Sequence, residues 1–112
     1  MRVRTKAFAL RIVRLYSALP KTTESQVLGK QMLRSGTSVG AHYREAKRAR
    51  STAEFVSKIE AGLQELEETI YWLELLQDAE IIRVSFLRGL LKEAEELASI
   101  FVASAKTAKR KI

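Results

Sequence analysis

This sequence predicts an all-α protein, an antiparallel up-and-down bundle of four helices that assembles into oligomers. Apolar residues make up 46% of the 112 residues, and they recur in four segments at spacings of three and four, the period of a helix with one buried face. Gly totals 5 and Pro 1, so turns are too scarce for an all-β fold. We expect a single domain over residues 1–112, with helices at about 5–19, 23–49, 51–78 and 83–108.

The first helix carries a regular apolar face and has a defined end. Pro20 ends it, because proline restricts the residue before it and cannot continue the helical hydrogen bonds. Thr23 followed by Gln26 has the form of a capping box, which predicts that the second helix starts there. The face of the first helix consists of Phe8, Ile12, Leu15 and Leu19.

Small residues crowd the middle of the second segment, in the run RSGTSVGAHYREA. Gly36 and Gly40 each cost about 1 kcal/mol relative to Ala inside a helix, so propensity favours a loop hinged at the glycines. The apolar spacing favours a helix, whose small side chains would let another helix approach closely. We predict the helix and keep the loop as the alternative. The spacing rests on Leu28, Met32, Ser35, Val39, Tyr43 and Ala46.

The third segment has the clearest helical pattern. Ser51 and Glu54 form a second capping box, and the break near Arg50 is either a loop or a kink. The apolar residues that follow alternate between spacings of four and three, as in bundle helices: Phe55, Ile59, Leu63, Leu66, Ile70 and Leu73.

The last two helices hold more apolar residues than one face needs. The fourth has a main row through Leu87, Leu91 and Phe101 and a second row through Phe86 and Leu90. We expect the excess to form a subunit interface, although a broad core face is the alternative. The candidate interface residues on these and the second helix are Gly36, Gly40, His42, Trp72, Leu90, Leu97 and Ile100.

Basic residues outnumber acidic ones by 20 to 13, and they are unevenly placed. Residues 1–58 hold 13 basic and 3 acidic residues, whereas residues 59–97 hold 3 basic and 10 acidic ones. Such asymmetry indicates a surface that binds polyanions, or a basic half that docks on an acidic protein; a merely solvated basic face is the third interpretation. The candidate phosphate contacts are Arg4, Arg11, Arg14, Arg34, Arg44, Lys47, Arg48 and Arg50.

Residues for catalysis are missing. The chain has no cysteine and one histidine, so neither a thiolate site nor a serine triad can be built. His42 and Glu45 occur once and in the reverse order of the di-iron motif, and no Gly-rich phosphate loop is present. Arg11 and Arg14 interrupt the apolar start of the chain. We expect a non-enzymatic, cytoplasmic protein with no metal, no cofactor and no membrane partner.

The run from Arg34 to Leu76 resembles the family of 23S rRNA intervening-sequence proteins, and weaker similarity covers nearly the whole chain. His42 stands where the family pattern has asparagine, so any role that needs that amide is not carried over. The matching residues are Arg34, Ser35, Ser38, Glu45, Ala46, Ser51, Glu54, Phe55, Lys58, Glu68, Thr69, Trp72 and Leu73.

The resemblance implies an antiparallel four-helix bundle that forms a ring, a homopentamer. Some genes of the family lie inside insertions in the gene for large-subunit ribosomal RNA, and the family's molecular function is largely undefined. The related accessory proteins of diversity-generating retroelements form basic pentamers that bind a reverse transcriptase and nucleic acid. Two hypotheses follow: weak binding of RNA or DNA through phosphates, or a scaffold that assembles with itself or with an acidic protein.

Overall fold

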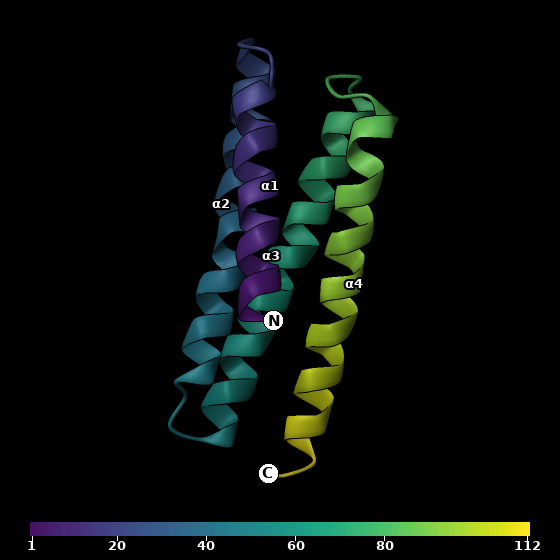
Figure 1. Ribbon diagram of the computed structural model, residues 1–112. Coiled ribbons are helices and arrows are strands. Elements are labelled where there is room, and N and C mark those ends of the chain that lie inside the picture. Colours follow the sequence, from purple (N-terminus) through teal and green to yellow (C-terminus); the bar gives the residue numbers. More distant parts are fainter.

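Four helices make up the computed structural model, which describes residues 1–112. They are α1 (Arg2–Ala18), α2 (Thr23–Lys47), α3 (Thr52–Asp78) and α4 (Val84–Lys109). No strand is present, so the predicted all-α class is confirmed. In Figure 1 the chain rises along α1, descends along α2, rises along α3 and descends along α4. The molecule measures 47 × 21 × 19 Å.

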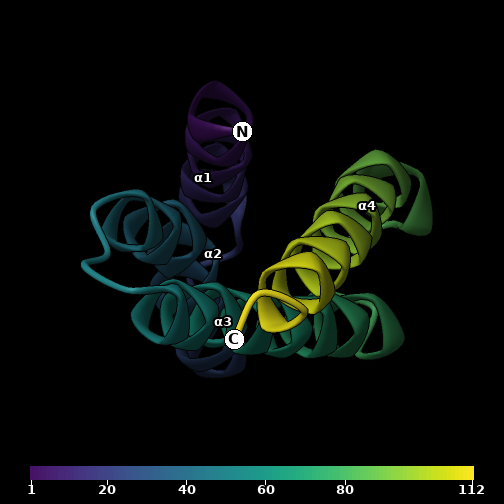
Figure 2. The same ribbon diagram turned by 90° about the horizontal axis from the view of Figure 1, so that it is seen from below.

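The helices pack in the order in which the chain makes them. α2 lies against α1 on one side and α3 on the other, and α4 lies against α3. α1 approaches α4 over a much shorter length, and Figure 2 shows these two helices standing apart over most of their course. α1 is also the shortest helix, and its first residue lies well above the loop that joins α2 to α3 (Figure 1). At its lower end the molecule therefore consists of α2, α3 and α4.

The helix starts follow the expected capping chemistry with one correction. The cap of α2 is Thr22 and not Thr23, and the Thr22 hydroxyl accepts a hydrogen bond from the Ser25 N–H. The cap of α3 is Ser51, as predicted, and its Oγ accepts from the Glu54 N–H at 3.0 Å. Residues 48–51 form a loop in which the chain reverses direction, so the alternative of a kink is wrong.

The small-residue run is helical, so the loop alternative is wrong. A Cβ added at Gly36 would lie 2.8 Å from Ile12 Cγ1 of α1, which means that the missing side chain is what lets the two helices touch. Gly40 lies one turn further on, and its added Cβ would lie 3.3 Å from Thr5 Oγ1. Burial against α1 offsets the low helix propensity of both glycines.

The opposite side of this run packs on α3 through a buried polar pair. Thr69 Oγ1 lies 2.8 Å from Ser35 Oγ, and both side chains are fully buried. Each hydroxyl is also within hydrogen-bond distance of a carbonyl oxygen of its own helix, at Glu65 and Met32. The pair therefore buries no unsatisfied group and sets the register of α2 on α3.

The apolar surplus of α4 belongs largely to the core. Leu90 is 4% exposed and Leu97 is fully buried within the single chain, so the prediction that they form a subunit interface is wrong. Gly36 and Gly40 serve the contact between α1 and α2 within the single chain. The physical reason is that α4 turns one broad face, which carries the main row together with Leu90 and Leu97, to the rest of the bundle, whereas Phe86 of the second row is 73% exposed. None of the four helices has the length and hydropathy that spanning a bilayer requires.

The glycine contacts lead to a matched pair of substitutions. Gly36→Ala should lower the free energy of unfolding by about 1–2 kcal/mol, because the new methyl group meets the branched Cβ region of Ile12 and the overpacking outweighs the gain in helix propensity. Gly40→Ala should change stability by less than Gly36→Ala, because its added Cβ would lie 3.3 Å from Thr5 Oγ1, a tight contact that a small shift of Thr5 relieves while the helix propensity improves by about 1 kcal/mol. Urea unfolding followed by circular dichroism measures both; a stable Gly36→Ala protein would contradict the close approach.

Candidate functional site

Two of the predicted phosphate contacts already have carboxylate partners. Arg4 of α1 donates two hydrogen bonds to the carboxylate of Glu93 in α4, at 2.8 and 2.7 Å, and a third to Glu96 at 3.2 Å. Arg34 of α2 pairs with Glu68 of α3 at 2.7 Å and, less closely, with Glu65. These arginines hold neighbouring helices together, and their charge is largely neutralised within the chain.

The titration of the partners reflects these contacts. Hydrogen bonding from Arg4 lowers the pKa of Glu93, against the opposing effect of partial burial. The Glu68 carboxylate correspondingly raises the pKa of Arg34. Glu93 is therefore ionised at neutral pH, and the ion pair between α1 and α4 is complete.

Three other predicted contacts, Arg44, Lys47 and Arg48, gather near the lower end of the molecule. A cavity of about 510 Å³ opens there between the start of α1 and the last turns of α2. We call it the basic cavity; its lining residues are Arg2, Tyr43, Arg44, Glu45, Lys47 and Arg48. Lys47 and Arg48 follow Arg44 by three and four residues, which places all three on the last turn of α2 and its C-cap.

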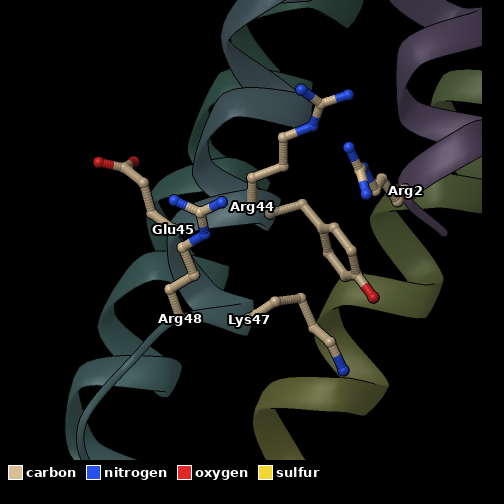
Figure 3. Close-up of a pocket in the computed structure, with 6 residues that line it drawn as sticks. Arg2, Arg44, Glu45, Lys47 and Arg48 are labelled. Carbon is tan, nitrogen blue, oxygen red and sulfur yellow. The ribbon is translucent and has the colours of Figure 1, made fainter.

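None of the four cationic side chains of the basic cavity has an acidic partner in the chain. Figure 3 shows the guanidinium groups of Arg2 and Arg44 facing one another from different helices, with no carboxylate between them. Glu45 points away from the cavity in the same view. Its carboxylate is held outside by His42 Nδ1 at 2.8 Å and Lys58 Nζ at 3.6 Å. Like charges that face each other unpaired are the arrangement that an anion stabilises.

The contact between α1 and α2 creates this cavity. Gly36 and Gly40 seat α1 on the same side of α2 that carries Tyr43 and Lys47. Since α1 begins at Arg2, that side of α2 is uncovered beyond this level. The Tyr43 ring closes the inner wall against Phe101 of α4, with 6.2 Å between ring centroids. No acidic residue occupies the first turn of α1, so the positive end of that helix is uncompensated as well.

The other predicted contacts lie outside the cavity. Arg50 lies in the loop between α2 and α3 and lines a separate shallow hollow with Lys111. Arg11 and Arg14 are exposed on α1, higher up the molecule. The sequence analysis missed Arg2, because the residue precedes the apolar pattern of the first helix; the absence of acidic residues before Glu24 is the signal that could have indicated it.

The residues predicted for other roles are placed as follows. His42 is half-buried, and it packs beside Gly62 of α3 while hydrogen-bonding Glu45. No group of three or more His, Cys, Asp or Glu side chains is arranged to hold a metal ion. Trp72 and Ile100 are half-buried, and the Trp72 Nε1–H is shielded from solvent without a hydrogen-bond acceptor.

Comparison with known proteins now identifies the family. Residues 2–103 match the family described as 23S rRNA-intervening sequence protein. The chain belongs to this family. A crystal structure of a protein of unknown function from Bacteroides thetaiotaomicron VPI-5482, described as a member of the S23 ribosomal protein family, is 39% identical with a TM-score of 0.89. The similarity covers 94% of this chain and 97% of that one. No curated protein matches the sequence.

Membership of the family confirms the resemblance found in the sequence, and it leaves the chemistry of the site to be argued from the residues. The matched structure is itself described as having unknown function. The unpaired cations of the basic cavity would suit an anionic ligand.

The ion pair between α1 and α4 predicts a change in titration. In Arg4→Gln the pKa of Glu93 should rise toward its ordinary value, because the hydrogen bonds that lower it are removed. A lowered folded-state pKa stabilises the native protein above the unfolded-state pKa and is lost as pH falls through the folded value. The variant should therefore lose less stability than wild type on acidification below about pH 5. NMR titration of the Glu93 carboxyl group checks this; an unchanged pKa would show that the pair does not form.

Proposed function

We propose that this protein is a non-enzymatic, nucleic-acid-binding member of its family, and that RNA or DNA binds through phosphates at the basic cavity without strong sequence specificity. The observation that carries the proposal is the set of four unpaired cations, Arg2, Arg44, Lys47 and Arg48, around one cavity. Other arginines of the chain, Arg4 and Arg34, do have carboxylate partners. Unpaired cations release bound counterions when they meet phosphates, and that release drives association.

The lower end of the bundle adds charge around the cavity. The last turn of α4 and the residues after it carry Lys106, Lys109, Arg110 and Lys111, and only Lys109 has an acidic partner, Glu60 at 2.8 Å. Arg50 lies in the loop at the same end. These groups extend the positive field beyond the cavity and favour long-range attraction of a polyanion.

The composition of the site supports binding without base recognition. Tyr43 is the one aromatic residue of the basic cavity, and its ring packs against Phe101 instead of standing free to stack on successive bases. Arginine and lysine contacts to phosphate position a nucleic acid but do not distinguish its sequence. We therefore expect similar affinity for unrelated sequences.

Charge reversal tests the proposal. The triple variant Arg44→Glu, Lys47→Glu and Arg48→Glu should bind labelled single strands of two unrelated sequences at least about tenfold more weakly than wild type, and by the same factor for both. For wild type, the logarithm of affinity should fall with the logarithm of salt with a slope of about −2 to −3. Fluorescence anisotropy measures both quantities.

A matched control separates the cavity from overall charge. Lys21→Glu, Lys30→Glu and Arg88→Glu change the net charge equally, on exposed residues without acidic partners outside the lower end. This control should retain most of the wild-type affinity. Equal loss in both triple variants would assign binding to net charge alone, and absent or salt-independent binding by wild type would reject nucleic acid in favour of an acidic protein partner.

We also propose that the chain assembles with itself, as its resemblance to pentameric bundles implies. Support comes from the side of α1 turned away from the bundle, where large apolar residues are exposed: Val3 at 81%, Leu10 at 43% and Val13 at 41%. These residues lie opposite Phe8 and Ile12 at helical spacing and form an apolar strip that Lys6 and Arg14 flank. A strip of this kind on a soluble protein marks a contact surface.

Self-assembly is tested by mass. Light scattering after size-exclusion chromatography should give an oligomer for wild type, and Leu10→Glu combined with Val13→Glu should shift the mass toward that of the 12.7 kDa chain, because each interface would bury unpaired carboxylates. Val27→Glu, on α2, provides the control on an exposed apolar residue away from the strip. A monomeric wild type would reject the proposal.

A further inference from the structure

The basic cavity gathers its cationic side chains around one volume and does not distribute them along the surface. Arg44, Lys47 and Arg48 fall within five residues at the end of α2, where Arg48 is the C-cap, so their backbones span about 6 Å along the helix axis. Arg2 reaches the same volume from another helix, and its guanidinium group faces that of Arg44 (Figure 3). A surface that follows a nucleic-acid backbone needs cations spaced along the strand, because each internal phosphate carries one charge.

A strand has one kind of phosphate with more than one charge, the phosphomonoester at its end. Such a group carries about −1.5 to −2 at pH 7 and offers three free acceptor oxygens. Arginine binds phosphate oxygens in pairs through its planar fork, and lysine adds a point charge. Three arginines and a lysine without protein acceptors therefore match the charge and the acceptors of a terminal phosphate better than those of an internal one.

The walls of the cavity fit an end better than a continuous strand. One side is closed by Arg2 in the first turn of α1, and this turn has neither a side-chain cap nor an acidic residue that would offset the positive end of the helix. Tyr43 forms the inner wall, and its hydroxyl group has no hydrogen-bond partner within the chain. The cavity of about 510 Å³ has room for a phosphate and part of the attached nucleoside.

We propose that the basic cavity binds the terminal phosphomonoester of a nucleic-acid strand, so that the protein distinguishes phosphorylated from unphosphorylated ends. This inference rests on the proposed function, because it assigns a specific part of the same polyanion to the same residues. Internal phosphates then meet the surrounding cations of the loop and the chain end, such as Arg50 and Arg110, and contribute the part of the affinity that is independent of the end.

The experiment compares strands that differ in one phosphate. Short single strands of identical sequence with a 5′-phosphate, a 3′-phosphate or hydroxyl groups at both ends, each labelled at an internal base, are titrated with wild-type protein at physiological ionic strength. A strand with a terminal phosphate should bind at least about tenfold tighter than the strand with hydroxyl ends, as expected for several charge-assisted hydrogen bonds. A gain at either end supports the inference.

Paired variants locate the effect. Arg2→Gln with Arg44→Gln should reduce the ratio between phosphorylated and hydroxyl ends to near one, while Lys21→Gln with Lys30→Gln should leave the ratio unchanged. All four residues are exposed, and circular dichroism confirms that the variants fold. A ratio that survives in Arg2→Gln with Arg44→Gln would overturn the assignment to the cavity.

The outcomes separate this inference from the proposed function. Equal affinity for all three strands in wild type would overturn end recognition and leave phosphate-driven binding standing. No binding of any strand would reject both. A phosphoserine peptide that competes as well as the phosphorylated strand would overturn the commitment to nucleic acid, because the cavity would then recognise a phosphate irrespective of its carrier.

Discussion

The close contact between α1 and α2 is the constraint on which the rest of the structure depends. It exists because Gly36 has no side chain where Ile12 lies, and because Gly40 repeats this arrangement one turn later against Thr5. A bulkier residue at Gly36 would push α1 outward along its whole length, since a helix moves as a rigid body over a few turns. The position of Arg2, at the start of α1, is fixed by the same contact.

The opposite side of the same helical run performs a second task. Ser35 and Thr69 join α2 to α3 through buried hydroxyl groups. The contacts of α2 with α1 and with α3 therefore lie within two turns of α2. Gly62 continues this pattern on α3, where an added Cβ would meet the Phe101 ring of α4. Small residues thus set the spacing of all four helices, while large apolar residues supply the driving force for burial.

The packing of the helices also decides which basic side chains are paired with carboxylates and which are not. Acidic residues of α3 and α4 meet Arg34, near the middle of α2, and Arg4, in the first turn of α1, and each ion pair links two helices. Lys109 meets Glu60 nearer the lower end. None of the carboxylates on α3 and α4 pairs with Arg44, Lys47 or Arg48 at the last turns of α2. The positive end of the molecule therefore depends on where the helices place the acidic residues, and not on an excess of basic residues alone.

The sequence by itself determined the four helices, the capping of α3 by Ser51 and the basic segment of α2, because spacing, capping and charge are local properties that each segment carries along the chain. Only the tertiary structure decided which apolar rows became core, and it placed Leu90 and Leu97 inside, because burial depends on how wide a face each neighbour covers. The tertiary structure likewise decided which basic side chains form ion pairs. It also brought Arg2 beside Arg44, 42 positions later in the sequence. Contacts between residues so far apart follow from the packing of rigid helices, for which no local pattern in the sequence exists.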